Sequence, residues 1–297
     1  MASVAQLVED GAAPPATDYQ HFTLEPVTGA LGAEVSDIDL ATVDGAAGAE
    51  LGAALNQHLV LFFRDQDISL DQHMALAGHF GTVIDHPYVE SLDGHPGIIK
   101  IVKEAGEEHN WGGNWHADMT FTEAPPLGAV LCAREVPPWG GDTLFANLKL
   151  AYDTLSDGMK TMLDGLSAVH YSGKTTSYAQ HYQGMQGRDD VTEESHEHPV
   201  VRTHPGTGRK GLFVNRIFTR RLAGMSVEES QPILDFLYDH CERPAFTCRF
   251  RWRVNSVTIW DNRAVMHNAL SDYHPGRTGQ GYRRVLHRAT IAGDKPY

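Results

Sequence analysis

The 297-residue sequence contains no run of about 18 apolar residues, so we expect no transmembrane helix. Its N-terminus lacks the basic segment and the apolar stretch of a secretory signal peptide, which favours a cytoplasmic protein. Cysteine is scarce, and the three present, Cys132, Cys241 and Cys248, do not have the spacing of a metal site. We therefore expect reduced, buried thiols rather than a disulfide framework.

The chain is also poor in basic residues, with 24 Lys and Arg against 38 Asp and Glu, which gives a formal net charge of -14. This balance disfavours nucleic acid as a partner, because nonspecific binding to phosphates depends on basic surface. It does not exclude a small anionic substrate, because arginines gathered at one site can outweigh the overall sign. With 41% hydrophobic residues, the chain is long enough to bury one large core.

The order of elements predicts a mainly β protein with flanking helices. Short apolar or alternating segments, typical of strands, are separated mostly by turns. We expect strands at 58–64, 98–103, 128–133, 246–253, 257–260 and 284–291, and helices at 45–57, 71–80, 152–166 and after Ser226. The helix at 152–166 is expected to break near Ser156, which can cap a second helix. This order lacks regular βαβ alternation, which favours a β-sandwich or jelly-roll core with helices packed outside it.

The expected domain organisation is simple. Residues 1–18, rich in Ala and Pro, are typical of a poorly ordered tail, and residues 19–297 are expected to form a single domain. The stretch at about 171–198 has no clean periodicity and ends in an acidic run. We interpret it as a lid insertion, with a disordered loop as the alternative.

The segment 114–121 places a histidine and a carboxylate two residues apart, at His116 and Asp118. In an extended segment both side chains would project from one face. Together they make two thirds of the 2-His-1-carboxylate triad that is typical of non-haem Fe(II) oxygenases. A His-x-Asp pair alone is a weak signal among 17 histidines. A lone histidine is more often structural, but His267, which follows a predicted strand and turn, is the leading candidate for the third ligand.

Two arginines are expected on one face of the last predicted strand. Arg284 and Arg288 would lie about 13 Å apart along it. Buried guanidinium groups need anions, and they bind carboxylate or sulfonate oxygens through paired hydrogen bonds. One arginine could hold a dicarboxylate co-substrate and the other an acidic substrate, unless both face solvent or pair with Asp and Glu. A Gly-Gly-Asp turn precedes Thr143, whose hydroxyl could help to hold the same carboxylate.

In combination, these features resemble the taurine dioxygenase family of Fe(II)- and 2-oxoglutarate-dependent oxygenases. The resemblance covers nearly the whole chain after the tail, and it is carried by residues 60–66, 80–81, 86–87, 114–121, 140–144, 198–204, 212–215, 260–262 and 283–296. Two further stretches, 203–211 and 246–249, resemble the aryloxyalkanoate dioxygenases of the same family. The implied fold is a double-stranded β-helix, a jelly-roll or cupin-like core.

The resemblance also implies roles for individual residues. His116, Asp118 and His267 would bind Fe(II), and Thr143 and Arg284 would bind the distal carboxylate of 2-oxoglutarate. The substrate-binding residues would be His86, Tyr88, Asn114, Phe218 and Arg288, with Arg288 and His86 contacting the anionic group of the substrate. Gly112 and Ser172 stand where the taurine enzyme has an asparagine and an aromatic residue, which disfavours taurine and favours a bulkier acid.

The implied reaction is the O2-dependent hydroxylation of a small anionic organic acid, such as a sulfonate, a sulfate ester or an aryloxyalkanoate. It is coupled to the conversion of 2-oxoglutarate to succinate and CO2, and the hydroxylated product can fragment. Because Asp118 is retained, hydroxylation is favoured over the halogenation of related enzymes that lack this carboxylate. The family further implies a dimer or a tetramer.

Two other functions are compatible with part of the pattern. A metal-dependent hydrolase or isomerase on a cupin-like barrel would use a zinc-bound water and the same three ligands. It would have no use for Arg284 and Thr143. A non-catalytic jelly-roll binding module is the third possibility, and the combination of the three ligands with the arginine pair argues against it.

Overall fold

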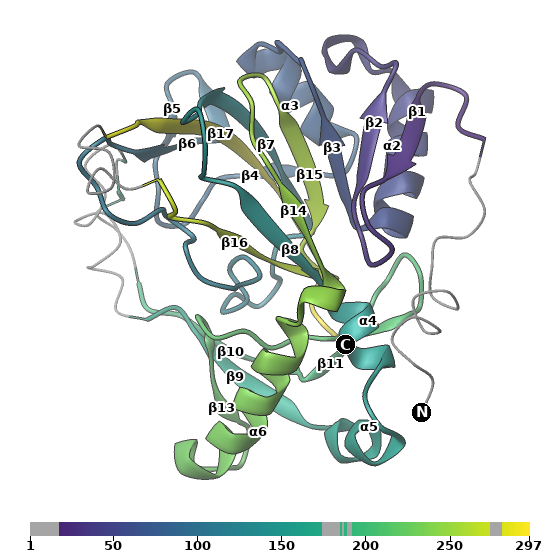
Figure 1. Cartoon of the computed structure of the whole chain (residues 1–297). Coiled ribbons are helices and arrows are strands. Elements are labelled where there is room, and N and C mark those ends of the chain that lie inside the picture. The colour runs from purple at the N-terminus through teal and green to yellow at the C-terminus, as the bar shows by residue number, and fades with distance from the viewer. Residues whose placement is uncertain (1–17, 174–184, 186, 189–191, 274–280) are drawn as a thin grey trace.

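A computed structural model describes residues 18–173, 185, 187–188, 192–273 and 281–297 of the chain (Figure 1). Almost all of the predicted tail, 1–18, and the centre of the predicted insertion, 171–198, lie outside the described residues. The described strands and helices build two facing β-sheets with helices beside them and a smaller layer below.

The larger sheet has the strand order β1-β2-β3-β15-β7-β17-β6-β5, and β4 pairs with β17. Within the described residues, β2 and β3 are parallel and the other neighbouring strands are antiparallel. Its strands are β1 Thr23–Pro26, β2 Ala33–Ser36, β3 Val60–Phe63, β4 Val83–Ile84, β5 Ser91–Leu92, β6 His95–Lys103, β7 Gly128–Glu135, β15 Val257–Asp261 and β17 Arg284–Ile291.

The smaller sheet faces the larger one and has the antiparallel order β14-β8-β16. Its strands are β8 Thr143–Asn147, β14 Thr247–Phe250 and β16 Val265–Ala269. Across the interface, Phe62 of β3 stacks on Phe250 of β14 with ring centroids 4.3 Å apart. The two packed sheets confirm the predicted jelly-roll core. The predicted strand 246–253 is shorter than expected at both ends, because Phe246 lies in a 3-10 turn and the pairing with β8 ends at Phe250.

Side-chain alternation along the strands decides which groups enter the space between the sheets. On β3, Leu61 and Phe63 pack with the helices on the outer face, whereas Phe62 points to the smaller sheet. This is the period of two that a doubly covered strand requires. The same rule on β17 directs Arg284 and Arg288 to the inner face, where both side chains are buried.

The helices begin at side chains that cap them. They are α2 Gly45–His58, α3 Leu70–Gly78, α4 Leu148–Asp153, α5 Asp157–Leu163 and α6 Val227–Cys241, with 3-10 turns η1 Leu40–Thr42 and η3 Pro244–Phe246. Asp44 accepts hydrogen bonds from the first turn of α2, and Ser226 forms a capping box with Glu229. The predicted break at Ser156 is confirmed, because its hydroxyl caps α5.

A smaller layer lies below the two sheets in Figure 1. It contains the sheet β10-β9-β13 and the pair β11-β12, formed by β9 Ser167–Tyr171, β10 Ser195–Pro199, β11 Val201–Thr203, β12 Lys210–Leu212 and β13 Thr219–Leu222. The antiparallel pairing of β9 with β10 brings the two ends of the predicted insertion together. Its described ends are therefore regular strands rather than irregular chain.

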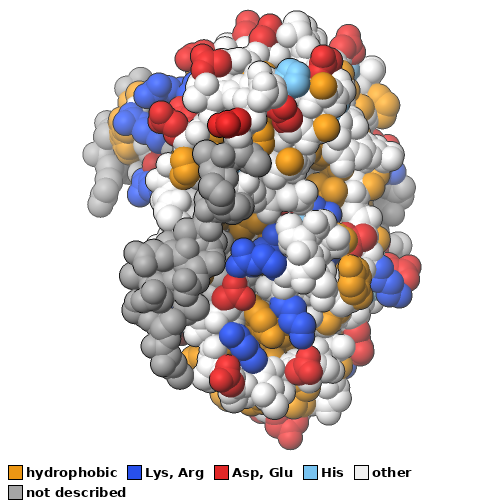
Figure 2. All heavy atoms as spheres, turned by 90° about the vertical axis from the view of Figure 1, so that its right-hand side faces the viewer, with side chains coloured by type: hydrophobic (Ala, Val, Ile, Leu, Met, Phe, Trp, Pro, Cys, Tyr) orange, Lys and Arg blue, Asp and Glu red, His pale blue; other side chains and the backbone are white. Residues whose placement is uncertain are grey.

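The face of the molecule in Figure 2 carries acidic and basic side chains intermixed. Large exposed hydrophobic side chains of the described residues are scattered over separate elements, for example Val27, Met162, Phe236 and Val254. In the part of the chain that the structure describes, no helix combines the length and the apolar character needed to cross a membrane.

Candidate metal centre and active site

His116, Asp118 and His267 converge on one point, as the sequence predicts. Each offers a ligand atom, and these atoms all lie within 4.8 Å of one another. Oδ1 of Asp118 lies 3.6 Å from Nε2 of His116 and 3.9 Å from Nε2 of His267. All three residues are buried. Two imidazoles and one carboxylate at this spacing can hold a divalent transition metal on one face.

The two histidines are brought together by backbone pairing. His267 lies on β16, and His116 forms an isolated antiparallel bridge with it. The N–H of His116 donates to the carbonyl of His267 over 3.1 Å, and the reverse bond is 2.8 Å long. Directly opposed residues of an antiparallel pair have neighbouring side chains, and these ring centroids are 4.3 Å apart.

Asp118 reaches the histidines in a way that the sequence does not predict. The expected extended segment does not continue to Asp118, which begins a turn. Its neighbour Met119 has a φ of 46°, in the left-handed region that non-glycine residues rarely adopt. The carboxylate is therefore positioned by the turn and its contacts, and the predicted strand alternation is wrong at this point.

Hydrogen bonds and burial prepare the three side chains for a metal. Nδ1 of His116 lies 2.7 Å from the carbonyl oxygen of Asn114, which can only accept, so Nδ1 carries a hydrogen and Nε2 is the nitrogen that can bind a metal. Burial, together with the nearby His116, lowers the pKa of His267 to about 3, so its ring is neutral. Burial opposes the charge of Asp118, but Arg288 and the histidines hold its pKa well below the usual range.

Arg288 contacts the same carboxylate. Its Nη1 donates to Oδ1 of Asp118 over 3.1 Å, and its Nη2 lies 3.0 Å from Oδ2. Its guanidinium carbon also lies 6.0 Å from the ring centre of Trp111 and 5.6 Å from that of Trp260. The residue predicted to bind a substrate anion is thus adjacent to the predicted metal, and its guanidinium lies near two aromatic rings.

A narrow cavity extends from His116 and His267 to Arg284. Arg284 is 3% exposed, and its Nε has no hydrogen-bond partner among the described residues. Thr143 lines the same cavity, and its hydroxyl oxygen accepts a 2.9 Å bond from the indole N–H of Trp252. The hydroxyl hydrogen is therefore left to donate to another group. A buried guanidinium whose Nε has no hydrogen-bond partner among the described residues, beside a free hydroxyl donor, fits the distal carboxylate of 2-oxoglutarate.

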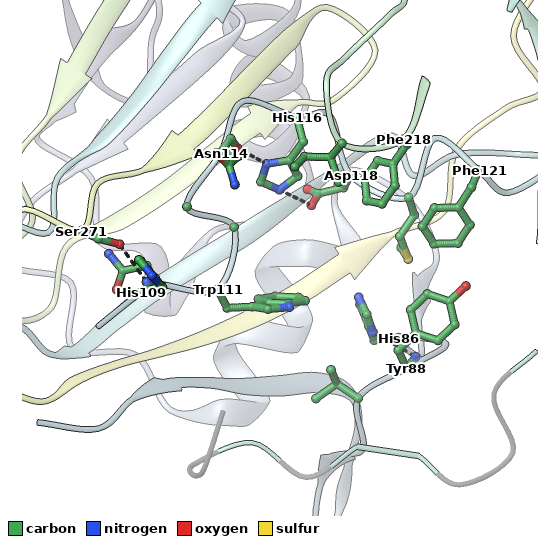
Figure 3. A pocket seen from close by; sticks show the side chains of 16 residues that line it. His86, Tyr88, His109, Trp111, Asn114, His116, Asp118, Phe121, Phe218 and Ser271 are labelled. Atoms are coloured by element: carbon green, nitrogen blue, oxygen red, sulfur yellow. Dashed lines mark hydrogen bonds and ion pairs between the residues drawn. The ribbon is translucent and has the colours of Figure 1, made fainter. Parts of the chain in front are cut away.

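A larger cavity of about 570 Å³ opens on the other side of His116 and Asp118 (Figure 3). The predicted substrate residues His86, Tyr88, Asn114 and Phe218 all line it. Arg288 lies beside it, in the wall of the narrow cavity. Phe218 packs against Phe121 with ring centroids 5.0 Å apart at 67°. The structure therefore brings the five predicted residues around one space.

His86 is prepared to donate a hydrogen bond within this cavity. Burial and the charge of Arg288 lower the pKa of His86 to about 3, so the ring is neutral. Its Nδ1 accepts a 3.2 Å bond from the backbone N–H of Tyr88. The ring hydrogen of the neutral form is then on Nε2, which makes Nε2 a donor suited to an anion.

Several residues of this site were not predicted from the sequence. Trp111, Phe121 and Ile217 line the larger cavity, and Figure 3 shows the indole of Trp111 below His116 and beside His86. Trp111 also lines the narrow cavity, so it forms part of the partition between the two. The aromatic residues on either side of the His-x-Asp motif were a signal that they could line the site. The direction in which their side chains point depends on the conformation of the loop, which the sequence pattern does not give.

Comparison with known proteins identifies related chains of one family. The model of the taurine catabolism dioxygenase TauD, TfdA family matches residues 23–290. An alkylsulfatase of Acinetobacter baylyi is 35% identical over 93% of this chain and 86% of its own length. An alpha-ketoglutarate-dependent sulfate ester dioxygenase of Pseudomonas putida is 34% identical, covering 92% of this chain and 90% of its own. The crystal structure of a taurine dioxygenase from Burkholderia xenovorans, 35% identical, superposes with a TM-score of 0.77 over 93% of this chain and 92% of that one.

The family model covers most of the chain, and the alkylsulfatase is more than 30% identical over nearly all of it. This chain therefore belongs to the TauD/TfdA family of taurine catabolism dioxygenases.

Proposed function

We propose that this enzyme hydroxylates a sulfate ester, or a related sulfonate, on the carbon that bears the anionic group. The enzyme is an Fe(II)- and 2-oxoglutarate-dependent dioxygenase that uses O2 and acts on a small anionic substrate. The observation that carries the proposal is the His116, Asp118 and His267 group, which opens on one side to the buried Arg284 and on the other to an aromatic cavity.

Two sets of residues hold the reactants. His116, Asp118 and His267 bind Fe(II), and Arg284 with Thr143 binds the distal carboxylate of 2-oxoglutarate. When bound, iron, 2-oxoglutarate and O2 together supply the oxidising power for C–H hydroxylation, with succinate and CO2 as co-products. The chain itself positions one C–H bond at the metal and excludes water from the site.

The anionic group of the substrate is bound by Arg288 and His86. Arg288 can form paired hydrogen bonds with two oxygens of a sulfate or a sulfonate, and Nε2 of His86 can donate a third. Because Arg288 also contacts Asp118, an anion held there is next to the metal. The carbon attached to that anion is then the one nearest the site of oxidation.

The other end of the substrate is apolar. Among the described residues lining the larger cavity, Asp118 is the one acidic side chain, and it belongs to the metal site. A substrate ammonium group, such as that of taurine, would therefore have no carboxylate to pair with. The rings of Tyr88, Trp111, Phe121 and Phe218 instead favour an alkyl or aryl group, which supports a bulkier acid.

Oxidation at this carbon breaks a sulfate ester without a separate hydrolytic step. Hydroxylation converts R-CH2-O-SO3⁻ to R-CH(OH)-O-SO3⁻, with one oxygen of O2 in the new hydroxyl and the other in succinate. The hydroxylated carbon then loses hydrogen sulfate, and the electron pair of the C–O bond leaves with it. The products are R-CHO, hydrogen sulfate, succinate and CO2. A sulfonate would react in the same way and release sulfite.

The test is an assay of the purified enzyme with Fe(II), ascorbate and 2-oxoglutarate against alkyl sulfates, taurine and aryloxyalkanoates. We expect succinate, sulfate and aldehyde in equal amounts from alkyl sulfates, and little turnover of taurine. If no compound stimulates succinate formation, the substrate class is wrong. If 2-oxoglutarate does not bind to the metal-loaded enzyme, the assignment of its site to Arg284 and Thr143 is wrong.

Removal of O2 separates this function from metal-dependent hydrolysis. A hydrolase would release sulfate from the ester without O2 or 2-oxoglutarate, using a metal-bound water. The dioxygenase needs both reagents for every sulfate released. Sulfate formation under strict anaerobic conditions would therefore contradict the proposal and favour a hydrolase.

The location and assembly of the enzyme are further parts of the proposal. We expect a cytoplasmic homo-oligomer, a dimer or a tetramer, with no nucleic acid or membrane as a partner. Light scattering of the purified full-length chain would give its mass in solution, and a monomeric mass would contradict the expected assembly.

A further inference from the structure

The side chain of Asn262 is bonded to the backbone of Asp118 on both sides. Its Oδ1 accepts a 2.7 Å hydrogen bond from the N–H of Asp118, and its Nδ2 donates a 3.0 Å bond to the carbonyl of the same residue. The second hydrogen of Nδ2 is directed to the carbonyl of Pro126, 3.2 Å away. Asn262 is fully buried, and the three bonds occupy both ends of its amide.

This contact replaces the pairing that a strand would provide. Asp118 lies in a turn, outside the described strands, and it precedes Met119 with its φ of 46°. A backbone in that conformation persists only when surrounding groups hold it. The amide of Asn262 acts on Asp118 as a neighbouring peptide group would in a sheet, because it satisfies the N–H and the C=O at once.

The turn that carries Asn262 is itself firmly held. Its neighbour Asp261 is fully buried and accepts bonds from Arg263, at 2.8 and 2.7 Å, and from His204, at 2.7 Å. The backbone N–H of Asn262 also donates to the carbonyl of Leu127 over 2.8 Å. The amide is therefore presented to Asp118 from a rigid support.

The same turn leads directly into β16 and His267. It joins β15 Val257–Asp261 to β16 Val265–Ala269. The same short connection therefore contacts Asp118 through Asn262 and begins the strand that carries His267. We propose that Asn262 is a positioning residue for the metal, which fixes the carboxylate of Asp118 relative to His267. This inference rests on the proposed role of Asp118 as a metal ligand.

The experiment measures metal affinity rather than activity. Mn(II) is titrated by calorimetry into the metal-free, full-length wild type and into the variants Asn262→Ala and Asp118→Ala, in the absence of 2-oxoglutarate. Loss of a group that orients a ligand typically weakens metal binding by about 10- to 100-fold, and we expect this change for Asn262→Ala. Asp118→Ala, which lacks the carboxylate altogether, sets the upper limit of the effect.

Asn147 offers a matched control for general loss of stability. It is also buried, and its amide bonds to the backbone at both ends, to the carbonyl of Ala30 and the N–H of Leu150. Neither partner belongs to the metal site. Asn147→Ala should therefore lower the thermal unfolding midpoint, as Asn262→Ala does, and leave Mn(II) affinity unchanged.

The outcomes are distinguishable. Weakened Mn(II) binding in Asn262→Ala, with normal binding in Asn147→Ala, supports the inference. Normal binding in Asn262→Ala, or equal weakening in both variants, overturns it while leaving the metal site intact. If the wild type itself does not bind Mn(II), the proposed metal site and this inference both fail. Should Asn262→Ala not fold, Asn262→Ser is measured against the same criteria.

Discussion

The guanidinium group of Arg288 contacts both carboxylate oxygens of Asp118, with Nη1 3.1 Å from Oδ1 and Nη2 3.0 Å from Oδ2. Both residues are buried. Asp118 is also the carboxylate of the His-Asp-His group, so one side chain faces a guanidinium and a metal position together. A metal bound there would compete with Arg288 for the carboxylate and make the arginine more available to a substrate anion. Metal binding and substrate binding are therefore expected to assist each other.

The pair makes a prediction about the metal-free enzyme. Replacing one partner of a buried ion pair leaves the other charge uncompensated and typically costs about 3–5 kcal/mol. We expect Arg288→Met to lower the free energy of unfolding by that amount without metal, and by clearly less with saturating Mn(II), because the metal supplies the missing positive charge. Urea unfolding with and without Mn(II) would measure this difference. An equal loss under both conditions would contradict it.

Replacing Arg284, unlike replacing Arg288, should affect ligand binding and not the stability of the free enzyme. Its guanidinium is buried, and its Nε has no partner among the described residues, so Arg284→Met should leave the stability of the co-substrate-free enzyme unchanged or raise it. Because a hydrogen bond to a charged group contributes about 1.5–3 kcal/mol, 2-oxoglutarate affinity should fall by roughly 10- to 100-fold. Calorimetric titration of 2-oxoglutarate into the Mn(II)-loaded variant tests this.

The neighbouring Arg283 is the control for that measurement. It pairs with Glu104 and Glu135 at the surface, 3.0 Å from each, and points away from the cavity by strand alternation. Arg283→Met should bind 2-oxoglutarate like the wild type. If the two variants lost affinity equally, Arg284 would have no specific role in binding the co-substrate.

A side chain at Gly112 is predicted to press against the imidazole of His116. A Cβ there would lie 3.1 Å from Cε1 and 3.5 Å from Nε2 of His116, and the residue has a φ of +78° that favours glycine. Gly112→Ala should therefore displace the imidazole and weaken Mn(II) binding. Gly106→Ala, in the same loop with nothing within 4 Å of its Cβ, should bind Mn(II) normally. Calorimetric titration of Mn(II) into both variants measures this difference. Normal Mn(II) binding by Gly112→Ala would count against the predicted steric contact.

His73 should contribute to acid sensitivity. Burial lowers its pKa from 6.5 to about 4, and its Nε2 lies 3.0 Å from the carbonyl of Val130. Above pH 6.5 the ring is neutral in the folded and unfolded chain, so it adds no pH dependence there. Below that pH only the unfolded chain takes up the proton, which lowers the free energy of unfolding by about 1.4 kcal/mol per pH unit until the folded ring also titrates.

The variant His73→Gln removes this titration and keeps a donor for the carbonyl. We expect its unfolding free energy to fall less steeply than that of the wild type between pH 6.5 and about 4. Urea unfolding at a series of pH values within that window would show it. Parallel pH profiles for the two proteins would exclude His73 as a source of the sensitivity.

Some parts of the site followed from local patterns. Alternation along the last strand places Arg284 and Arg288 on one face, and the structure has them both on the inner face of β17. Ser156 was recognised as a helix cap because capping needs only neighbouring residues. By contrast, the predicted extended run through Asp118 was wrong, because a turn there is stabilised by Asn262, 144 residues away in sequence.

The sequence by itself determined the chemistry available to this protein: which side chains can bind a metal, which can bind anions, and that Arg284 and Arg288 share one face of a strand. These depend on residue type and on backbone periods that act over a few residues. Only the tertiary structure decided that Arg288 pairs with Asp118, that Trp111 lines both cavities, and that the amide of Asn262 bonds to the backbone of Asp118. Those relationships arise where two sheets and several loops pack together, and contacts between distant segments leave no local pattern to read.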